Sequence, residues 1–216
     1  MKLAVFDCDG TLIDGQASIC DAMELAFAGA GLAAPARNDV RRAVGLSLPQ
    51  AIARLAPEID EATRVALVAS YKDAFRAARS GGTLSQTMFP GLRDVLEQLS
   101  AGGWTLAVAT GMSDRGLAHC LAANDIAHHF VTLQTADRHP SKPNPEMLET
   151  ALFEAGAQPR EAVMIGDTAY DMIMARDAGV RAIGVDWGYH EPAELTAAGA
   201  EFIAATPAAL SEYLLK

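Results

Sequence analysis

The first residues that could do chemistry lie at the end of a short apolar run near the N-terminus. Asp7 and Asp9 are separated by one residue and are followed by Gly10 and Thr11. Because side chains alternate along a strand, both carboxylates are expected on one side, with Cys8 pointing into the packed interior. Two like charges at a strand end are unfavourable unless a positive group lies beside them.

Further polar residues follow other apolar runs. Asp167 and Asp171 stand four residues apart where a helix should begin, so they share one helical face. Thr110 and Gly111 follow the strand pattern "WTLAVA", and Lys142 lies in the loop "HPSKPNPEML". Ligands of open parallel sheets bind beyond the carboxyl ends of the strands, so we expect these residues to converge there.

As many as four carboxylates would then lie near one point. Such a cluster destabilises a fold unless a cation neutralises it. Mg²⁺ prefers a few carboxylates together with water and phosphate oxygens. The residues therefore predict a magnesium site that takes phosphate, with the carboxylates of Asp7, Asp9, Asp167 and Asp171 around it.

Strand and helix patterns alternate over most of the chain, which predicts an α/β fold: a Rossmann-like parallel sheet with helices on both faces. Strands are expected at 3–6, 104–109, 129–133, 162–165, 180–185 and 201–204. Helices are expected at 91–101, 113–123, 144–156, 169–178 and 206–215.

The stretch between the first two strands carries only helical signals. An amphipathic face begins at Ile19, and helices are expected at 36–44, 47–56 and 59–79. Acids and bases balance within residues 14–80, so the net charge of −10 comes from the rest of the chain. The predicted domains are a core of residues 1–14 plus 82–216 and an inserted all-helical cap of residues 15–81, with glycines at its hinges.

The composition limits the classes of molecule that this protein is expected to bind. The net charge of −10 and the lack of a basic stripe argue against nucleic acid, and no apolar run approaches the roughly 18 residues of a membrane helix. Three cysteines without metal-like spacing predict free thiols and a cytoplasmic protein. The expected partner is a small phosphorylated metabolite, and both monomer and homodimer remain open. The chain has no P-loop, GxGxxG or GxSxG motif.

These motifs, in this order, resemble the haloacid dehalogenase-like (HAD) superfamily of hydrolases. The resemblance covers essentially the whole chain, and the helical insertion lies where that family has its C1-type cap. It is carried by "VFDCDGTLID" (5–14), "AVATGMS" (107–113), "SKPNPEML" (141–148) and "MIGDTAYDMIMARDAG" (164–179). The segments "VGLSLPQAI" (44–52) and "AIGVDWGYHEPAEL" (182–195) are most similar to the phosphoglycolate phosphatase-like branch, subfamily IA.

The resemblance implies an Mg²⁺-dependent phosphatase that forms an aspartyl-phosphate with a small, phosphoglycolate-like monoester. Asp7 would be the nucleophile, and Asp9 would protonate the leaving alkoxide and then activate water. Asp7, the Asp9 carbonyl and Asp167 would hold the metal, with Asp171 acting through water or as an orienting group. Catalysis is thus assigned to Asp7, Asp9, Thr110 and Lys142.

The remaining implied residues bind phosphate or select the substrate. The phosphate-binding residues would be Gly10, Thr11, Thr110, Gly111 and Lys142. In the cap, Arg41, Arg42 and Gly45 lie near a helix-to-helix loop that could face the substrate, where an arginine would suit a small carboxylate-bearing phosphate.

Other chemistries remain as alternatives. Relatives that cleave halides or phosphonates lack an acid at the position of Asp9, which disfavours both. Phosphosugar mutases similar to β-phosphoglucomutase usually have an arginine where this chain has Leu48, and often a different residue at Thr11, so mutase activity is the runner-up. A receiver-type signalling protein or a non-catalytic phosphate-binding protein is the alternative of another class. Receiver domains are shorter and lack the insertion and the late GDxxxD motif.

Overall fold

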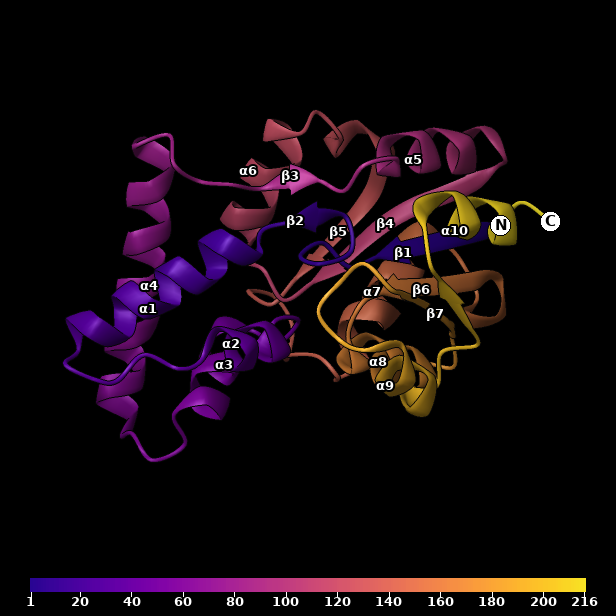
Figure 1. Cartoon of the computed structure of the whole chain (residues 1–216). Coiled ribbons are helices and arrows are strands. Elements are labelled where there is room, and N and C mark those ends of the chain that lie inside the picture. Colours follow the sequence, from indigo (N-terminus) through magenta and orange to yellow (C-terminus); the bar gives the residue numbers. More distant parts are fainter.

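The computed structural model describes residues 1–216, and its centre is a six-stranded parallel sheet (Figure 1). The strand order is β5-β4-β1-β6-β7-β8, and every neighbouring pair runs parallel. The strands are β1 (Lys2–Phe6), β4 (Trp104–Thr110), β5 (Phe130–Thr135), β6 (Ala162–Gly166), β7 (Arg181–Val185) and β8 (Phe202–Ala204). The predicted α/β class with a parallel sheet is confirmed.

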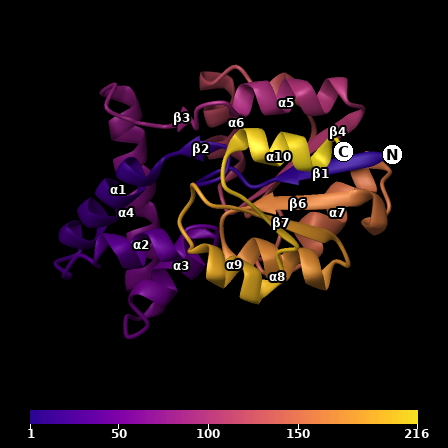
Figure 2. The same ribbon diagram turned by 45° about the vertical axis from the view of Figure 1, so that its right-hand side comes forward.

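Helices cover both faces of the sheet, which explains why β1 is apolar on both sides. Ala4 and Phe6 pack against one set of helices, and Leu3 and Val5 pack against the other. The first set is α5 (Leu92–Ala101), α6 (Asp114–Ala123) and α10 (Pro207–Leu214). The second set is α7 (Glu146–Ala155), α8 (Ala169–Asp177) and α9 (Pro192–Ala198). Figure 2 shows the sheet between these two layers.

Four helices form a separate body beside the sheet, at the left of Figure 1. They are α1 (Gln16–Gly29), α2 (Arg37–Ala43), α3 (Leu48–Leu55) and α4 (Glu61–Ser80). Their apolar side chains form a hydrophobic cluster of their own, which includes Ile19, Met23, Phe27, Ile52 and Leu67. We call this helical body the cap.

A small antiparallel pair of strands connects the cap to the sheet. In it, β2 (Ile13–Asp14) pairs with β3 (Thr87–Met88). The sequence analysis did not predict this pair, because two residues are too few to produce an alternating pattern. It also missed the seven-residue helix α9 and the short 3₁₀ turns at Ala127–His129 and Pro159–Glu161.

Two simple properties of the fold bear on the earlier expectations. No helix has both the length and the apolar character required to cross a membrane. Cys8, Cys20 and Cys120 are all buried and free, as expected from their spacing.

Candidate active site

The strand order brings the polar strand ends together. The strands β4, β1 and β6 are direct neighbours, and Thr110, Asp7 and Asp167 stand at or just after their carboxyl ends. The Asp7 N–H donates a hydrogen bond to the Ile165 carbonyl oxygen at 2.9 Å, which continues the β1–β6 ladder to the site. The sheet therefore brings Asp7 beside two residues that lie more than a hundred positions later in the sequence.

Three carboxylates meet at this edge of the sheet. Oxygen atoms of Asp7, Asp167 and Asp171 lie within 4.8 Å of one another, and all three side chains are buried. Asp9 is not part of this trio. Its side chain lines the neighbouring cavity, and its Oδ1 atom is buried without a hydrogen-bond partner.

The ammonium group of Lys142 partly offsets this negative charge. Its Nζ atom lies 2.8 Å from Asp7 Oδ1 and 2.6 Å from Asp171 Oδ1, and the lysine side chain is fully buried. Burial alone would lower the pKa of Lys142, but attraction by Asp171 and Asp7 outweighs it and raises the pKa. The neighbouring carboxylates therefore favour the charged form of Lys142.

Burial and mutual repulsion make the acids of the site weaker. Burial, with repulsion from Asp171, raises the pKa of Asp7 to about 6 despite the opposing attraction of Lys142. Burial, with repulsion from Asp7, raises the pKa of Asp9 to about 7. The pKa of Asp167 is raised well above its ordinary value by burial and then by the charges of Asp7 and Asp171. In the absence of a cation the trio is thus electrostatically unfavourable.

The Asp171 carboxylate accepts hydrogen bonds from two different parts of the structure. Its Oδ2 atom accepts hydrogen bonds from the Thr168 N–H at 3.1 Å and the Thr168 hydroxyl at 2.7 Å, which forms the capping box of α8. Its Oδ1 atom accepts the hydrogen bond from Lys142 at 2.6 Å. The ion pair with Lys142, which Asp167 does not form, favours an orienting role of Asp171 toward Lys142.

Asp167 is held by residues from two other segments. The Thr11 hydroxyl donates to its Oδ1 atom at 2.8 Å, and the Tyr189 N–H donates to its Oδ2 atom at 2.9 Å. Trp187 Nε1 donates to the Thr11 carbonyl oxygen at 2.9 Å, which links the two segments. A Cβ atom at Gly188 would lie 2.1 Å from Asp167 Cβ, so only glycine permits this approach.

The sequence analysis assigned no site role to Trp187, Gly188 or Tyr189. The structure shows that they position Asp167. Their spacing carries no signal for this role, because it depends on how the loop after β7 returns over the end of β6.

The carboxylates fit a hard divalent cation. Asp7 Oδ2 is buried and has no hydrogen-bond partner, although an ionised oxygen in that position strongly requires one. Beside it are the oxygens of Asp167, and the donor set of carboxylate oxygens is the type that Mg²⁺ prefers. These residues therefore form a candidate metal site.

A cavity of about 460 Å³ opens from this site into the cap. Asp7, Asp9, Thr110 and Gly111 line its end at the sheet, and Gly45 lines it from the cap. The Thr110 hydroxyl oxygen accepts a hydrogen bond from the Met112 N–H at 3.3 Å, so the hydroxyl hydrogen is free to donate into the cavity. The Thr11 hydroxyl, in contrast, is used by Asp167.

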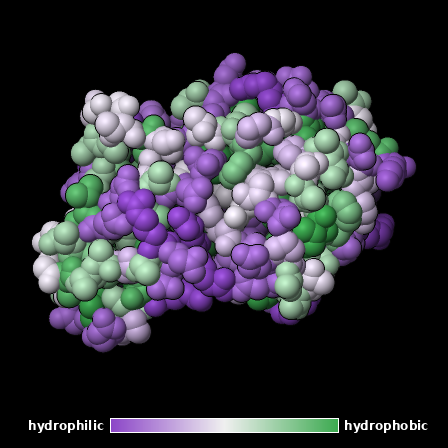
Figure 3. All heavy atoms as spheres, in the orientation of Figure 1, coloured by the Kyte–Doolittle hydropathy of each residue, from purple (hydrophilic) through white to green (hydrophobic).

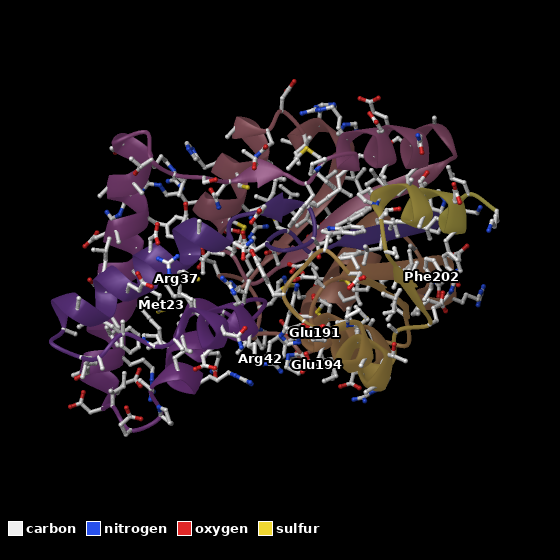
Figure 4. All side chains as sticks on the ribbon, viewed as in Figure 1. Met23, Arg37, Arg42, Glu191, Glu194 and Phe202 are labelled. Carbon is white, nitrogen blue, oxygen red and sulfur yellow. The ribbon has the colours of Figure 1, made fainter.

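The two cap arginines of the sequence analysis lie outside this cavity. Arg42 forms an ion pair with Glu194 of α9, with one N–O distance of 3.0 Å, and the two side chains adjoin in Figure 4. Arg41 faces a second cavity between α1 and α2, which Arg37 and Cys20 also line. Of the three cap residues expected to face the substrate, only Gly45 lines this cavity.

The cap rests directly on the sheet end. A Cβ atom at Gly111 would lie 2.5 Å from the Leu46 carbonyl oxygen, so the missing side chain permits close contact. The Ser47 N–H donates to Ser141 Oγ at 2.8 Å, and the Tyr170 hydroxyl donates to the Arg42 carbonyl oxygen at 3.1 Å. Hydrophilic residues gather on the surface where cap and sheet meet (Figure 3).

Comparisons with known proteins agree with this geometry. The sequence pattern of the family described as haloacid dehalogenase-like hydrolase matches residues 4–185. The chain is 35% identical to "Probable phosphatase IndB" of Dickeya dadantii over 94% of this chain and 89% of that protein. It is 29% identical to a phosphoglycolate phosphatase of Vibrio vulnificus, over 100% of this chain and 96% of the other. A haloacid dehalogenase-like hydrolase structure from Streptococcus pneumoniae superposes with a TM-score of 0.86 and 25% identity, covering 99% and 98% of the two chains.

Proposed function

Because this chain belongs to the haloacid dehalogenase-like hydrolase family, we propose that it is an Mg²⁺-dependent phosphatase of small phosphate monoesters. The observation that carries the proposal is the buried trio of Asp7, Asp167 and Asp171 against Lys142, with one oxygen of Asp7 left without a partner. We also propose the domain division at residues 15–81, which the separate hydrophobic cluster of the cap supports.

Asp7 acts as the nucleophile. One of its carboxylate oxygens attacks phosphorus, the bond from phosphorus to the ester oxygen breaks, and an aspartyl-phosphate forms on Asp7. A pKa of about 6 in the metal-free site leaves Asp7 largely ionised at neutral pH. Lys142, 2.8 Å from Asp7 Oδ1, orients that carboxylate.

Asp9 moves the proton in both halves of the reaction. It donates its proton to the departing alkoxide, and then takes a proton from the water that attacks phosphorus and releases Asp7. A pKa of about 7 suits both directions, because comparable amounts of acid and base are present at neutral pH. Asp9 lines the cavity, where the leaving group would lie.

The phosphoryl group is bound by donors at the sheet end. The free hydroxyl hydrogen of Thr110 and the N–H group of Gly111 are candidates for its oxygens. The Gly10 N–H, expected to bind phosphate, instead donates to the Ile13 carbonyl oxygen at 2.9 Å. Asp7, the Asp9 carbonyl and Asp167 would hold the Mg²⁺ ion, which supplies positive charge to the phosphoryl oxygens when it is bound. Thr11 and Asp171 act by orienting Asp167 and Lys142.

Phosphoglycolate is one candidate substrate, because relatives with that activity in their names match most of the chain. The test is phosphate release from a panel of phosphate esters with and without Mg²⁺. We expect turnover that EDTA abolishes and that the Asp7→Asn variant lacks. Phosphate release by Asp7→Asn at the rate of the unmodified protein would refute the mechanism. An isomerised sugar phosphate without free phosphate would instead identify a mutase, and failure to turn over any ester would favour a binding or signalling protein.

A further inference from the structure

The cavity over the active site is larger than a two-carbon acid requires. Its volume is about 460 Å³, and it extends from Asp7 and Asp9 into the cap. Pockets of roughly 300–1,000 Å³ are typical of sites that enclose drug-sized organic molecules. Its size therefore indicates a leaving group larger than glycolate.

The walls of the cavity within the cap are mostly apolar. All four cap helices contribute side chains, so the apolar surface surrounds the space and does not merely form one edge. The largest contributors are Ile19, Met23, Val40, Leu48, Tyr71 and Phe75. An apolar wall stabilises an apolar ligand by about 25 cal/mol for each Å² removed from water. Four cationic residues also line the cavity: Lys72, Arg76, Arg79 and Arg115.

Two neighbouring aromatic rings on α4 form part of this apolar wall. The ring centroids of Tyr71 and Phe75 are 5.1 Å apart with an interplanar angle of 34°. Both residues are only half-buried, although both border the cavity. Aromatic faces favour planar partners in offset or edge contacts.

A cation follows on the same face of α4. Arg79 lies four residues after Phe75 and eight after Tyr71, so the three share one side of the helix. Arg79 lines the cavity, makes no ion pair, and its buried Nε atom has no hydrogen-bond partner. In contrast, Arg76 is paired with Asp73. The guanidinium of Arg79 is therefore available to an acceptor on a ligand.

We propose that the substrate is a phosphate monoester of an alcohol with a planar, largely apolar body, and that this body carries a carboxylate or carbonyl oxygen directed at Arg79. The inference rests on the proposed phosphatase activity at Asp7 and adds the class of leaving group. Tyr71 and Phe75 contact the planar body, and Arg79 binds its polar end.

The test compares primary phosphate esters that differ only in the alcohol. Ethyl phosphate, phosphoglycolate, benzyl phosphate and 4-carboxybenzyl phosphate are hydrolysed with Mg²⁺, and kcat/KM is measured for each. We expect benzyl phosphate to exceed both two-carbon esters by tenfold or more, which is the discrimination that a few apolar groups provide. The additional carboxylate of 4-carboxybenzyl phosphate should increase kcat/KM again.

Variants assign the effect to the cavity. Phe75→Ala should lower the benzyl-to-ethyl ratio of kcat/KM about tenfold, and Phe75→Leu, which retains apolar volume, should lower it less. Arg79→Met should remove the advantage of 4-carboxybenzyl over benzyl phosphate. Phe153→Ala is the matched control, because Phe153 is 86% exposed on α7 and outside the cavity. Ratios within one variant cancel losses of folded protein.

Failures of the two proposals are distinguishable. A preference for phosphoglycolate over benzyl phosphate, or an unchanged ratio in Phe75→Ala, overturns the inference and leaves the phosphatase intact. If no ester is hydrolysed, calorimetric binding of benzyl and ethyl phosphate to the Asp7→Asn variant with Mg²⁺ decides the matter. Tighter binding of benzyl phosphate than of ethyl phosphate would support the assignment of the cavity and refute only the phosphatase activity. Equal binding of the two esters, or no binding, would refute both proposals.

Discussion

Replacing Lys142 by methionine tests the electrostatic basis of the site. Methionine keeps most of the length of the side chain and removes the ammonium group that lies 2.8 Å from Asp7 and 2.6 Å from Asp171. The carboxylate trio then has no neighbouring ammonium, and the protein without metal should become less stable.

The magnitude follows from the burial of the pair. The side chains of Lys142, Asp7 and Asp171 are at most 1% exposed, so water does not screen their interactions. Removing one partner of a buried ion pair costs about 3–5 kcal/mol. Hence the free energy of unfolding of Lys142→Met in EDTA at pH 8 should be lower by about that amount.

The loss should shrink in acid. The folded-state pKa of Asp7, about 6, exceeds its ordinary value of 3.8, so its contribution to stability is complete below pH 3.8 and declines as the pH rises through 6. The charge of Lys142 lowers the pKa of Asp7, so this pKa should be higher in the Lys142→Met variant. The decline in stability should then continue to a higher pH in the variant than in the unmodified protein. The variant and the unmodified protein should therefore differ most at pH 8 and least near pH 4.

Urea unfolding in EDTA at pH 8 and pH 5 provides the measurement, with Lys216→Met at the exposed C-terminus as the matched control. Turnover with Mg²⁺ should also fall, by about 10²–10³-fold, as for the loss of one preorganised donor. Equal stability of Lys142→Met and the control variant at pH 8 would refute the reasoning, since the trio would then need no fixed cation.

Three further changes test other parts of the site. Asp167→Asn should raise the Mg²⁺ concentration for half-maximal activity by about 10–100-fold, whereas Asp171→Asn should lower kcat with little change in that concentration; equal Mg²⁺ titrations would contradict the separate roles. Gly188→Ala should displace Asp167, because the new Cβ would lie 2.1 Å from the Asp167 Cβ, and thermal unfolding with and without Mg²⁺ should show a reduced stabilisation by metal. Glu194→Gln should lower stability by at most about 1 kcal/mol at pH 7, because the pair with Arg42 is about one-third exposed. Arg42 lowers the pKa of Glu194 to about 2, so this contribution is present above pH 4.5 and lost as the pH falls through 2; a difference that persists at pH 2 would contradict it.

The sequence predicted the catalytic end of the sheet because its chemistry is local to strand ends. Asp7 and Thr110 follow apolar runs, and a parallel sheet places the ends of such runs at one edge. The capping box between Thr168 and Asp171 was not predicted, although a threonine three residues before an acid is close to its pattern. The spacing did not reveal that Asp171 also accepts a hydrogen bond from Lys142.

In the cap, the sequence predicted the helices but not which of their side chains line the cavity. The pattern at 59–79 predicted a helix, and α4 is that helix, but which of its faces meets Asp7 depends on how the cap packs on the sheet. Tyr71, Phe75 and Arg79 were therefore missed as cavity residues. Arg42 was expected to face substrate because of its place beside a loop, yet its partner Glu194 lies on a helix too short to be predicted.

The charges at the site also couple metal binding to substrate binding. With all three carboxylates ionised beside one ammonium, the trio would carry two net negative charges, and burial together with this repulsion raises the pKa of Asp7 and Asp167. A phosphate ester dianion brought to the trio alone would add repulsion to a site already short of positive charge. A divalent cation held by Asp7 and Asp167 would offset this excess, so that the trio would no longer oppose binding of phosphoryl oxygens by the Thr110 hydroxyl. We therefore expect Mg²⁺ to strengthen the binding of a phosphate ester at this site, which calorimetric titration of the ester with and without Mg²⁺ would measure.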